Sequence, residues 1–201
     1  MLRVSLSELI AEVRIALDEN AVQSAYLQSS ADNLELDCII EAKLPEAARD
    51  ITETAEVSLL GPIAMPTEIT RTDGGGILTI PDDFLRLVSL KMSGWNKAVT
   101  MVAGEGSDIE LMQRNKYTRG TAMKPVAVFG RDSSGNKVIE YFGSGDTVEC
   151  ALYMPLPTVE GSGSNATLSI SRLLKPDIIR RAAGLTLLVR GDTEQAQIYL
   201  G

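Results

Sequence analysis

Apolar residues at the start of the chain recur with the spacing of an amphipathic helix. Between residues 5 and 17, one helix face collects Leu6, Leu9, Ile10, Val13, Ala16 and Leu17. Ser5 precedes this stripe and Glu8 follows three positions later, which is the spacing of a capping box, where each side chain bonds the other residue's backbone N–H. The pattern predicts a helix that begins at Ser5.

A second apolar stripe at helical spacing runs through residues 34–57. Its members are Leu36, Ile40, Leu44, Ala47, Ala48, Ile51 and Ala55. Pro45 lies inside the stripe, and an interior proline removes one helical hydrogen bond and clashes with the preceding turn. We therefore expect a kinked helix or two abutting helices, preceded by a polar loop at residues 18–33.

The pattern then changes to short β-type runs separated by turn residues. The glycine-rich segment 73–76 divides two such runs and predicts a hairpin. Later runs lie at residues 84–92, 126–129, 138–142 and 148–154. Their regular separation by Gly, Ser, Asn and Asp favours an antiparallel meander, with a short helical turn at residues 108–114.

Helical spacing returns near the end of the chain. After a loop expected at residues 155–165 and a β-branched segment at 167–171, Pro176 suits the first turn of a helix that Gly191 ends. A short helix is expected at 193–200. The helix before it is apolar on nearly all sides, so it is either central in a bundle or covered by another chain.

These patterns predict an α+β protein in which N- and C-terminal helices form a bundle and an antiparallel β module is inserted between them. We expect the N-terminal helices in residues 1–58, the β module in 59–158, and a loop with the C-terminal helices in 159–201.

Composition removes several classes of chemistry. The 201 residues include no histidine, which excludes Ser-His-Asp and Cys-His catalysis and histidine-ligated zinc. Cys38 and Cys150 lack metal-ligand or redox spacing, so we expect two buried, reduced thiols. No apolar run approaches the ~20 residues needed to cross a bilayer, and we expect a soluble chain with no membrane partner.

Three short motifs have a chemical and an ordinary interpretation. Gly161–Ala166 fits a dinucleotide fingerprint and Ser134–Lys137 fits an acyl-enzyme serine–lysine spacing, but the flanking residues favour loops in both cases. Asp82 and Asp83, with Asp108 and Glu110, can act as paired carboxylates or hold a divalent ion, although Asp after Pro is a common turn residue. We expect no metal site and no cofactor.

Charge is distributed unevenly along the chain, whose formal net charge is −8. Residues 1–58 contain 4 Lys/Arg against 12 Asp/Glu, whereas residues 171–190 contain 5 Lys/Arg against one Asp. The two segments can attract each other inside one fold or across neighbouring copies. The acidic surplus argues against tight wrapping of nucleic acid, but it allows DNA to pass without adhering.

The segment 114–120 is the densest basic stretch and contains Arg114, Tyr117 and Arg119. Such a segment can contact a phosphate or a base, or it can connect a helix to a sheet or contact another subunit.

The order of these features resembles a known family. The helical run through Leu44-Pro45-Glu46-Ala47-Ala48, the Ile80-Pro81-Asp82-Asp83-Phe84-Leu85 entry into the β module, and the closing helix with Ala182-Ala183 and Gly191-Asp192-Thr193-Glu194-Gln195-Ala196 carry the resemblance. They are similar to the head-to-tail adaptor proteins of short-tailed bacteriophages, the tail tubular protein A type, which includes ring proteins of crAss-like phages.

The resemblance implies a structural protein of the virion with no catalytic residues. In that family a helical bundle carries a β extension, and about a dozen copies form a ring beneath the portal protein. The ring continues the double-stranded DNA channel and receives the tail. We therefore expect a dodecameric homo-oligomer at the head–tail junction, made in the host cytoplasm.

Within such a ring, Glu12 and Asp37 either line the channel or pair with Arg180 and Arg181 of the next copy, and the loops at 18–33 and 155–165 contact neighbouring rings. Two alternatives stay open. One is a β module that binds glycan or protein and carries its helices as an oligomerisation stalk. The other is a hydrolase or transferase that uses Asp82 and Asp83.

Overall fold

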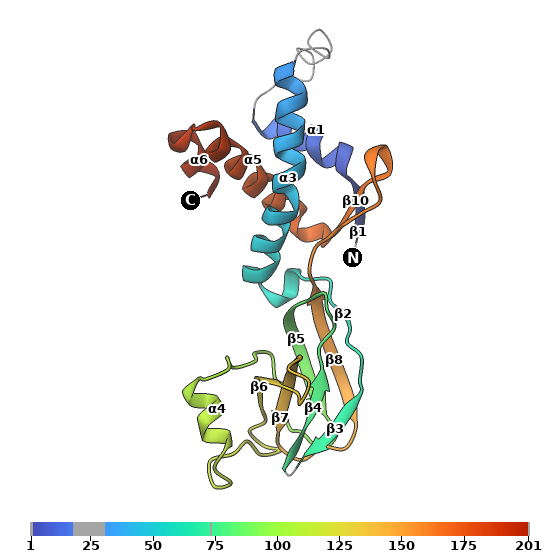
Figure 1. The fold of residues 1–201 in the computed structure, drawn as a ribbon, viewed down its shortest axis with the longest axis vertical. Helices are drawn as coiled ribbons and strands as arrows, with labels where there is room; N and C mark the ends of the chain where they lie inside the picture. The colour runs from blue at the N-terminus through green and yellow to red at the C-terminus, as the bar shows by residue number, and fades with distance from the viewer. Residues whose placement is uncertain (1, 18–30, 73, 201) are drawn as a thin grey trace. The chain divides into compact units, whose positions relative to one another are not determined.

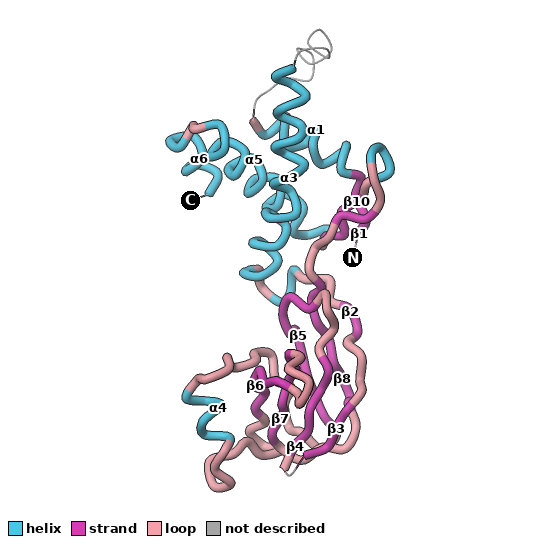
Figure 2. The backbone as a smooth tube through the Cα atoms, in the orientation of Figure 1, coloured by secondary structure: helices cyan, strands magenta, loops and turns pink. Residues whose placement is uncertain are grey.

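The computed structural model describes residues 2–17, 31–72 and 74–200, and the fold is mixed α+β, as expected (Figures 1 and 2). The chain divides into two compact units. Residues 1–61 and 156–201 form the first, here called the helical unit, and residues 62–155 form the second, here called the β unit. The β unit is therefore a continuous insertion in the chain of the helical unit.

The helical unit combines helices with a small antiparallel sheet. Its elements are β1 (Leu2–Ser5), α1 (Leu6–Ala16), α3 (Ala31–Thr54), η1 (Val57–Leu59), β9 (Val159–Glu160), η2 (Gly163–Asn165), β10 (Thr167–Ile170), η3 (Arg172–Leu174), α5 (Lys175–Arg190) and α6 (Thr193–Leu200). Helix α5 packs against α1, α3 and α6. Residues 182–187 of α5 are consecutively buried, so this helix is central within its own unit.

The signals at the ends of α5 act as expected. Pro176 lies in the first turn, and Gly191 ends the helix with a left-handed φ of 89°. Figure 1 shows α1 and α5 crossing α3 rather than running alongside it, so the expected helix bundle is not confirmed.

The capping box at Ser5 is wrong. Residues 2–5 form strand β1, which pairs with β10 in a three-stranded sheet of order β1-β10-β9. The Ser5 hydroxyl bonds the hydroxyl of Ser7 at 2.6 Å and caps no backbone N–H, while Leu6 N–H donates to the carbonyl of Ala166 at 2.9 Å. The loop expected at 155–165 likewise contains β9 and η2, because β10 offers a partner strand.

Helix α3 is one continuous helix through Pro45, and not two abutting helices. The predicted apolar face is its buried face, since Leu36, Ile40, Leu44, Ala47 and Ala48 are all buried. Packing of this face offsets the hydrogen bond that the proline removes. Of the polar loop expected at 18–33, residues 18–30 lie outside the described part of the chain and residues 31–33 belong to α3.

The β unit contains two antiparallel sheets. Its elements are β2 (Ile63–Ala64), β3 (Ile69–Thr72), β4 (Gly75–Thr79), β5 (Phe84–Met92), α4 (Asp108–Gln113), β6 (Val126–Arg131), β7 (Lys137–Phe142) and β8 (Val148–Pro155). The strand orders are β2-β8-β5 and β3-β4-β7-β6. Leu78, Leu90, Met92, Ile139 and Tyr141, all fully buried, contribute to one hydrophobic core.

The hairpin β3–β4 and the short helix α4 are confirmed, but the meander is only partly right. Strand β7 pairs with β6 as expected and then with β4, whereas β8 pairs with β5 in the other sheet. The connection between β7 and β8 explains why β8 joins the other sheet. Trp95 Nε1 donates to the carbonyls of Gly143 and Ser144 at 2.9 and 3.0 Å, and Ser93 Oγ accepts from the backbone of Asp146 and Thr147. These bonds direct the chain into the second sheet.

Both cysteines are free, as expected, but they are not buried as expected. Cys38 lies exposed on α3 and Cys150 is half-buried in β8. The buried face of α3 is formed by its larger aliphatic residues and alanines, which leaves Cys38 on the other side.

Candidate functional site

A candidate contact surface lies in the β unit, in residues 101–124, here called the α4 arm. Figures 1 and 2 show α4 and its flanking loops beside the strands. Of the fifteen large apolar side chains that are exposed in the described part of the chain, six belong to this segment: Met101, Ile109, Leu111, Met112, Tyr117 and Met123. Tyr117 is 84% exposed. The number of exposed apolar side chains in this one segment makes it a candidate interaction site.

Hydrogen bonds between polar groups inside the α4 arm fix its backbone. Gln113 is the buried residue of α4, with 3% of its surface exposed. Its amide oxygen accepts from Gly120 N–H at 2.8 Å, and its amide nitrogen donates to the Ile109 carbonyl at 2.8 Å. Arg119 Nε donates to the Gln113 carbonyl at 3.1 Å. The arm therefore buries its amide and exposes its apolar side chains, which is the reverse of an ordinary surface helix.

Charged groups fix the beginning of α4. Glu110 accepts from Gly106 N–H at 2.6 Å and pairs with Arg114 at 2.6 Å. The Gly106 bond, followed by the Arg114 bond, lowers the pKa of Glu110, and the Glu110 carboxylate raises the pKa of Arg114. Ser107 caps the helix by accepting from Glu110 N–H at 3.3 Å.

The predicted contact residues of the basic segment thus lie together in one arm. Tyr117 is beneath the ammonium of Lys116, which lies 5.0 Å from the ring centroid, and the Arg119 guanidinium lies 5.8 Å from the ring of Phe142. Arg114 and Arg119 hold the arm's structure, whereas Tyr117 faces solvent.

The other predicted contact residues lie in the helical unit, and three of the four form ion pairs within the chain. Glu12 pairs with Lys175 at 2.8 Å, Asp37 with Arg14 at 2.7 Å, and Arg181 with Asp50 at 2.8 Å. Arg180 is exposed and makes no hydrogen bond or ion pair with another described residue. The Glu12–Lys175 and Asp50–Arg181 pairs join the acidic and basic segments inside one fold, whereas the Asp37–Arg14 pair lies within the acidic segment.

Lys175 is the centre of the most connected of these pairs, because it also donates to Glu8 at 2.7 Å. Hydrogen bonds to Glu12 and then to Glu8 raise the pKa of Lys175 above 10.5. A raised pKa means that the ion pair stabilises the fold fully below the unfolded pKa, and that this contribution is lost as pH rises through the folded pKa.

We predict that Lys175→Met is less stable than the wild type at pH 7 and that the difference shrinks as pH rises above 10.5, through the raised pKa of Lys175. The measurement is the free energy of urea unfolding of both proteins between pH 7 and pH 12. Lys97→Met, which removes an exposed lysine of the β unit, is the control for the loss of one positive charge. If both variants follow the same pH curve, the Lys175 ion pair does not stabilise the fold in this way.

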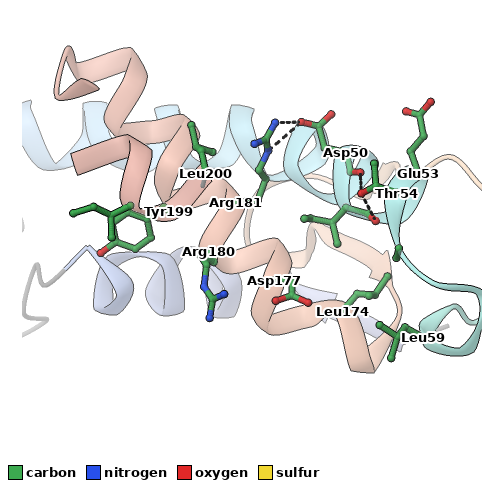
Figure 3. A pocket seen from close by; sticks show the side chains of 13 residues that line it. Asp50, Glu53, Thr54, Leu59, Leu174, Asp177, Arg180, Arg181, Tyr199 and Leu200 are labelled. Atoms are coloured by element: carbon green, nitrogen blue, oxygen red, sulfur yellow. Dashed lines mark hydrogen bonds and ion pairs between the residues drawn. The ribbon is translucent and has the colours of Figure 1, made fainter. Parts of the chain in front are cut away.

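A cavity of about 570 Å³ lies between α3, α5 and α6 in the helical unit (Figure 3). Its apolar lining includes Leu59, Leu174, Ile198 and Leu200, and Figure 3 shows the Arg181–Asp50 pair at one side. This volume is in the range of protein binding pockets. The cavity is therefore a mixed recess, because charged residues of both signs (Asp50, Glu53, Asp177, Arg180 and Arg181) line it together with the apolar side chains.

Helix α6 forms one wall of this cavity and is anchored near its C-terminal end. Tyr199 donates its hydroxyl hydrogen to the Ala16 carbonyl at 2.6 Å, which ties α6 to α1. Ile198 of the same helix is 79% exposed and does not belong to the buried core. The wall is thus held in place while its apolar side chain stays accessible.

The two aspartates considered for catalysis have different surroundings. Asp83 accepts from the Tyr153 hydroxyl at 3.0 Å; burial first, and then this carboxylate, raise the pKa of Tyr153 to about 12. Asp82 lines a separate recess of about 470 Å³ with Phe84 and Lys137. Within the described residues, no group of three His, Cys, Asp or Glu side chains is placed to hold a metal ion.

The two remaining motifs are loops, as expected. Ser134–Lys137 belongs to the turn and strand start between β6 and β7, where Asp132 accepts from Ser134 N–H and Asn136 N–H at 2.8 Å. The hydrogen bond from the Asn136 side chain contributes most to lowering the pKa of Asp132, and the backbone hydrogen bonds lower it further. Gly161–Ala166 contains η2 and connects β9 to β10, so no helix N-terminus follows it.

None of the described helices combines the length and apolar character that crossing a bilayer requires. A comparison with protein-family models found no match, and a comparison with curated proteins found no significant match.

Proposed function

We propose that this chain is a non-enzymatic structural protein of a bacteriophage virion, which assembles into a ring between the portal protein and the tail. The ring continues the channel through which double-stranded DNA leaves the head. The order of elements supports this proposal, because terminal helices form one unit and the β unit is inserted between them. The adaptor family that the sequence resembles has the same order.

The observation that carries the proposal is the α4 arm. An arm that is shaped by internal polar bonds and that exposes Tyr117 and several methionine and aliphatic side chains is built for contact with protein. Aromatic and methionine residues are enriched at protein interfaces, and isolated copies leave these residues in water. Assembly removes that exposure.

The acidic surface of α3 suits a channel lining. Glu35 and Glu41 are exposed on α3 and form no ion pair with another described residue. Carboxylates that face DNA repel its phosphates, so DNA slides past without adhering. This is the electrostatic requirement of a passage that is used once and must not retain its cargo.

The mass of the purified protein tests the proposal. We expect a closed oligomer of about a dozen copies at micromolar concentration, measured by sedimentation velocity and seen as rings by negative-stain microscopy. A particle of 21.6 kDa at every concentration and salt tested, with no ring at the portal vertex of intact particles, would overturn it.

A further inference from the structure

We propose that the folded β unit is a clamp that holds the two halves of the helical unit together. The first half is residues 1–61 and the second half is residues 156–201, and the whole β unit lies between them in the chain. This inference concerns the chain of one copy and does not depend on the ring proposed above. It gives the β unit a conformational role within each copy.

The helical unit is built from contacts between its two halves. Strand β1 pairs with β10, and α5 packs against α1 and α3, so each of these contacts joins the first half to the second. The Ser171 hydroxyl donates to the Leu59 carbonyl at 2.6 Å across the same division. The ion pairs of Lys175 and Arg181 also cross it. The helical unit therefore closes its core only when the two ends of residues 62–155 come together.

The β unit brings these two ends together by its own pairing. Strands β2 and β8 are antiparallel, with Ile63 opposite Tyr153 and Ala64 opposite Leu152. Residues that lie opposite each other in such a pair have Cα atoms about 4.5–5.5 Å apart. In the part of the chain that the structure describes, the core of the β unit and the partners of its strands all come from residues 62–155. The ends are therefore adjacent whenever the β unit is folded.

Chain entropy makes the adjacent ends important. When the β unit is unfolded, closing the helical unit also closes a loop of residues 62–155, whereas only a few residues form the loop once β2 and β8 are paired. Because closure entropy grows with the logarithm of loop length, the folding constant of the helical unit is on the order of a hundredfold higher with the β unit folded. The coupling is reciprocal, so a closed helical unit favours the folded β unit by the same factor. The disfavoured state is a closed helical unit with an unfolded β unit.

A disulfide across the β2–β8 pair replaces the clamp in the test. Met65 N–H donates to the Ala151 carbonyl, so the neighbouring pair, Ala64 and Leu152, is a non-hydrogen-bonded one. Its Cα atoms, about 4.5 Å apart, suit a disulfide. The test protein is the full chain with Ala64→Cys and Leu152→Cys, in which both native cysteines are changed to serine so that no other thiol competes.

Two further substitutions, Leu90→Ala and Ile139→Ala, unfold the β unit of this protein, because both residues are fully buried in its core. Trp95 fluorescence must report an unfolded β unit in the oxidised and the reduced protein, and Leu78→Ala is added where it does not. Far-ultraviolet circular dichroism follows the helical unit during urea unfolding at a concentration where the chain is monomeric. We expect a lower urea midpoint in the reduced protein than with an intact β unit, and a folding constant on the order of a hundredfold higher after oxidation.

The matched control has the same substitutions in the β unit but lacks the two added cysteines, and a reducing agent should leave its midpoint unchanged. A midpoint that rises on oxidation in the cysteine variant alone supports the clamp. If the oxidised and reduced forms unfold at the same midpoint, or if helices are absent from both, the clamp is wrong. Neither result bears on the ring, because these measurements concern single chains.

Discussion

Leu44→Ala is expected to lower the free energy of unfolding of the helical unit by about 3 kcal/mol. Leu44 is fully buried on α3, next to Pro45 inside the continuous helix, and its neighbours Ile40, Ala47 and Ala48 are also fully buried. Removing three carbons there loses transfer free energy and leaves a cavity that alanine neighbours cannot fill. Urea unfolding followed by far-ultraviolet circular dichroism, at a protein concentration where the chain is monomeric, measures the change.

The matched control is Leu173→Ala, because Leu173 lies in the same unit with 62% of its surface exposed. That substitution should change the free energy of unfolding by less than about 0.5 kcal/mol. Equal losses in the two variants would mean that the face of α3 that contains Leu44 is not the core of the helical unit.

Local signals explain the parts of the fold that the sequence predicts well. A β-type run between turn residues predicts β5, and the glycine-rich segment predicts the β3–β4 hairpin. Pro176 and Gly191 bound α5 in the same way. Each of these features depends on residues within a few positions of one another, so periodicity and turn chemistry suffice.

Pairings between distant segments could not be predicted in this way. Strand β1 has four residues, and its pairing with β10 joins segments more than 160 residues apart. The exchange of β8 into the second sheet depends on the bonds that Trp95 and Ser93 make with the β7–β8 connection. No period along the chain encodes either contact, and the same holds for the ion pairs of Lys175.

The candidate site shows the same division. The basic composition of residues 114–120 singles out the arm, including Tyr117. The exposed methionines Met101, Met112 and Met123 were missed, because an apolar residue in a sequence is ordinarily assigned to the core. The signal that could have found them is Gln113, a polar residue at a position where α4 needs an inward-facing side chain.

Gly75→Ala is expected to destabilise the β unit by about 3 kcal/mol, although the substitution adds a single methyl group. Gly75 begins β4 and pairs with Phe142 of β7. A Cβ at this position would overlap the carbonyl oxygen of Tyr141 and lie 3.0 Å from its carbonyl carbon. Because the obstacle is backbone in the adjacent strand, no side-chain rotation relieves it, and the β4–β7 pairing must shift.

Trp95 is the single tryptophan of the chain and is buried in the core of the β unit, so its fluorescence reports the unfolding of that unit. We expect the urea midpoint of the Trp95 transition to fall in Gly75→Ala, with the slope of the transition unchanged. Gly104→Ala is the matched control, because a Cβ there meets no atom within 4 Å, and its midpoint should stay at the wild-type value or rise slightly. If Gly75→Ala and Gly104→Ala unfold alike, the close approach of β4 to β7 does not require glycine. A selective loss in Gly75→Ala would show that this glycine, which the sequence pattern assigns to a turn, is needed instead for the packing of two paired strands.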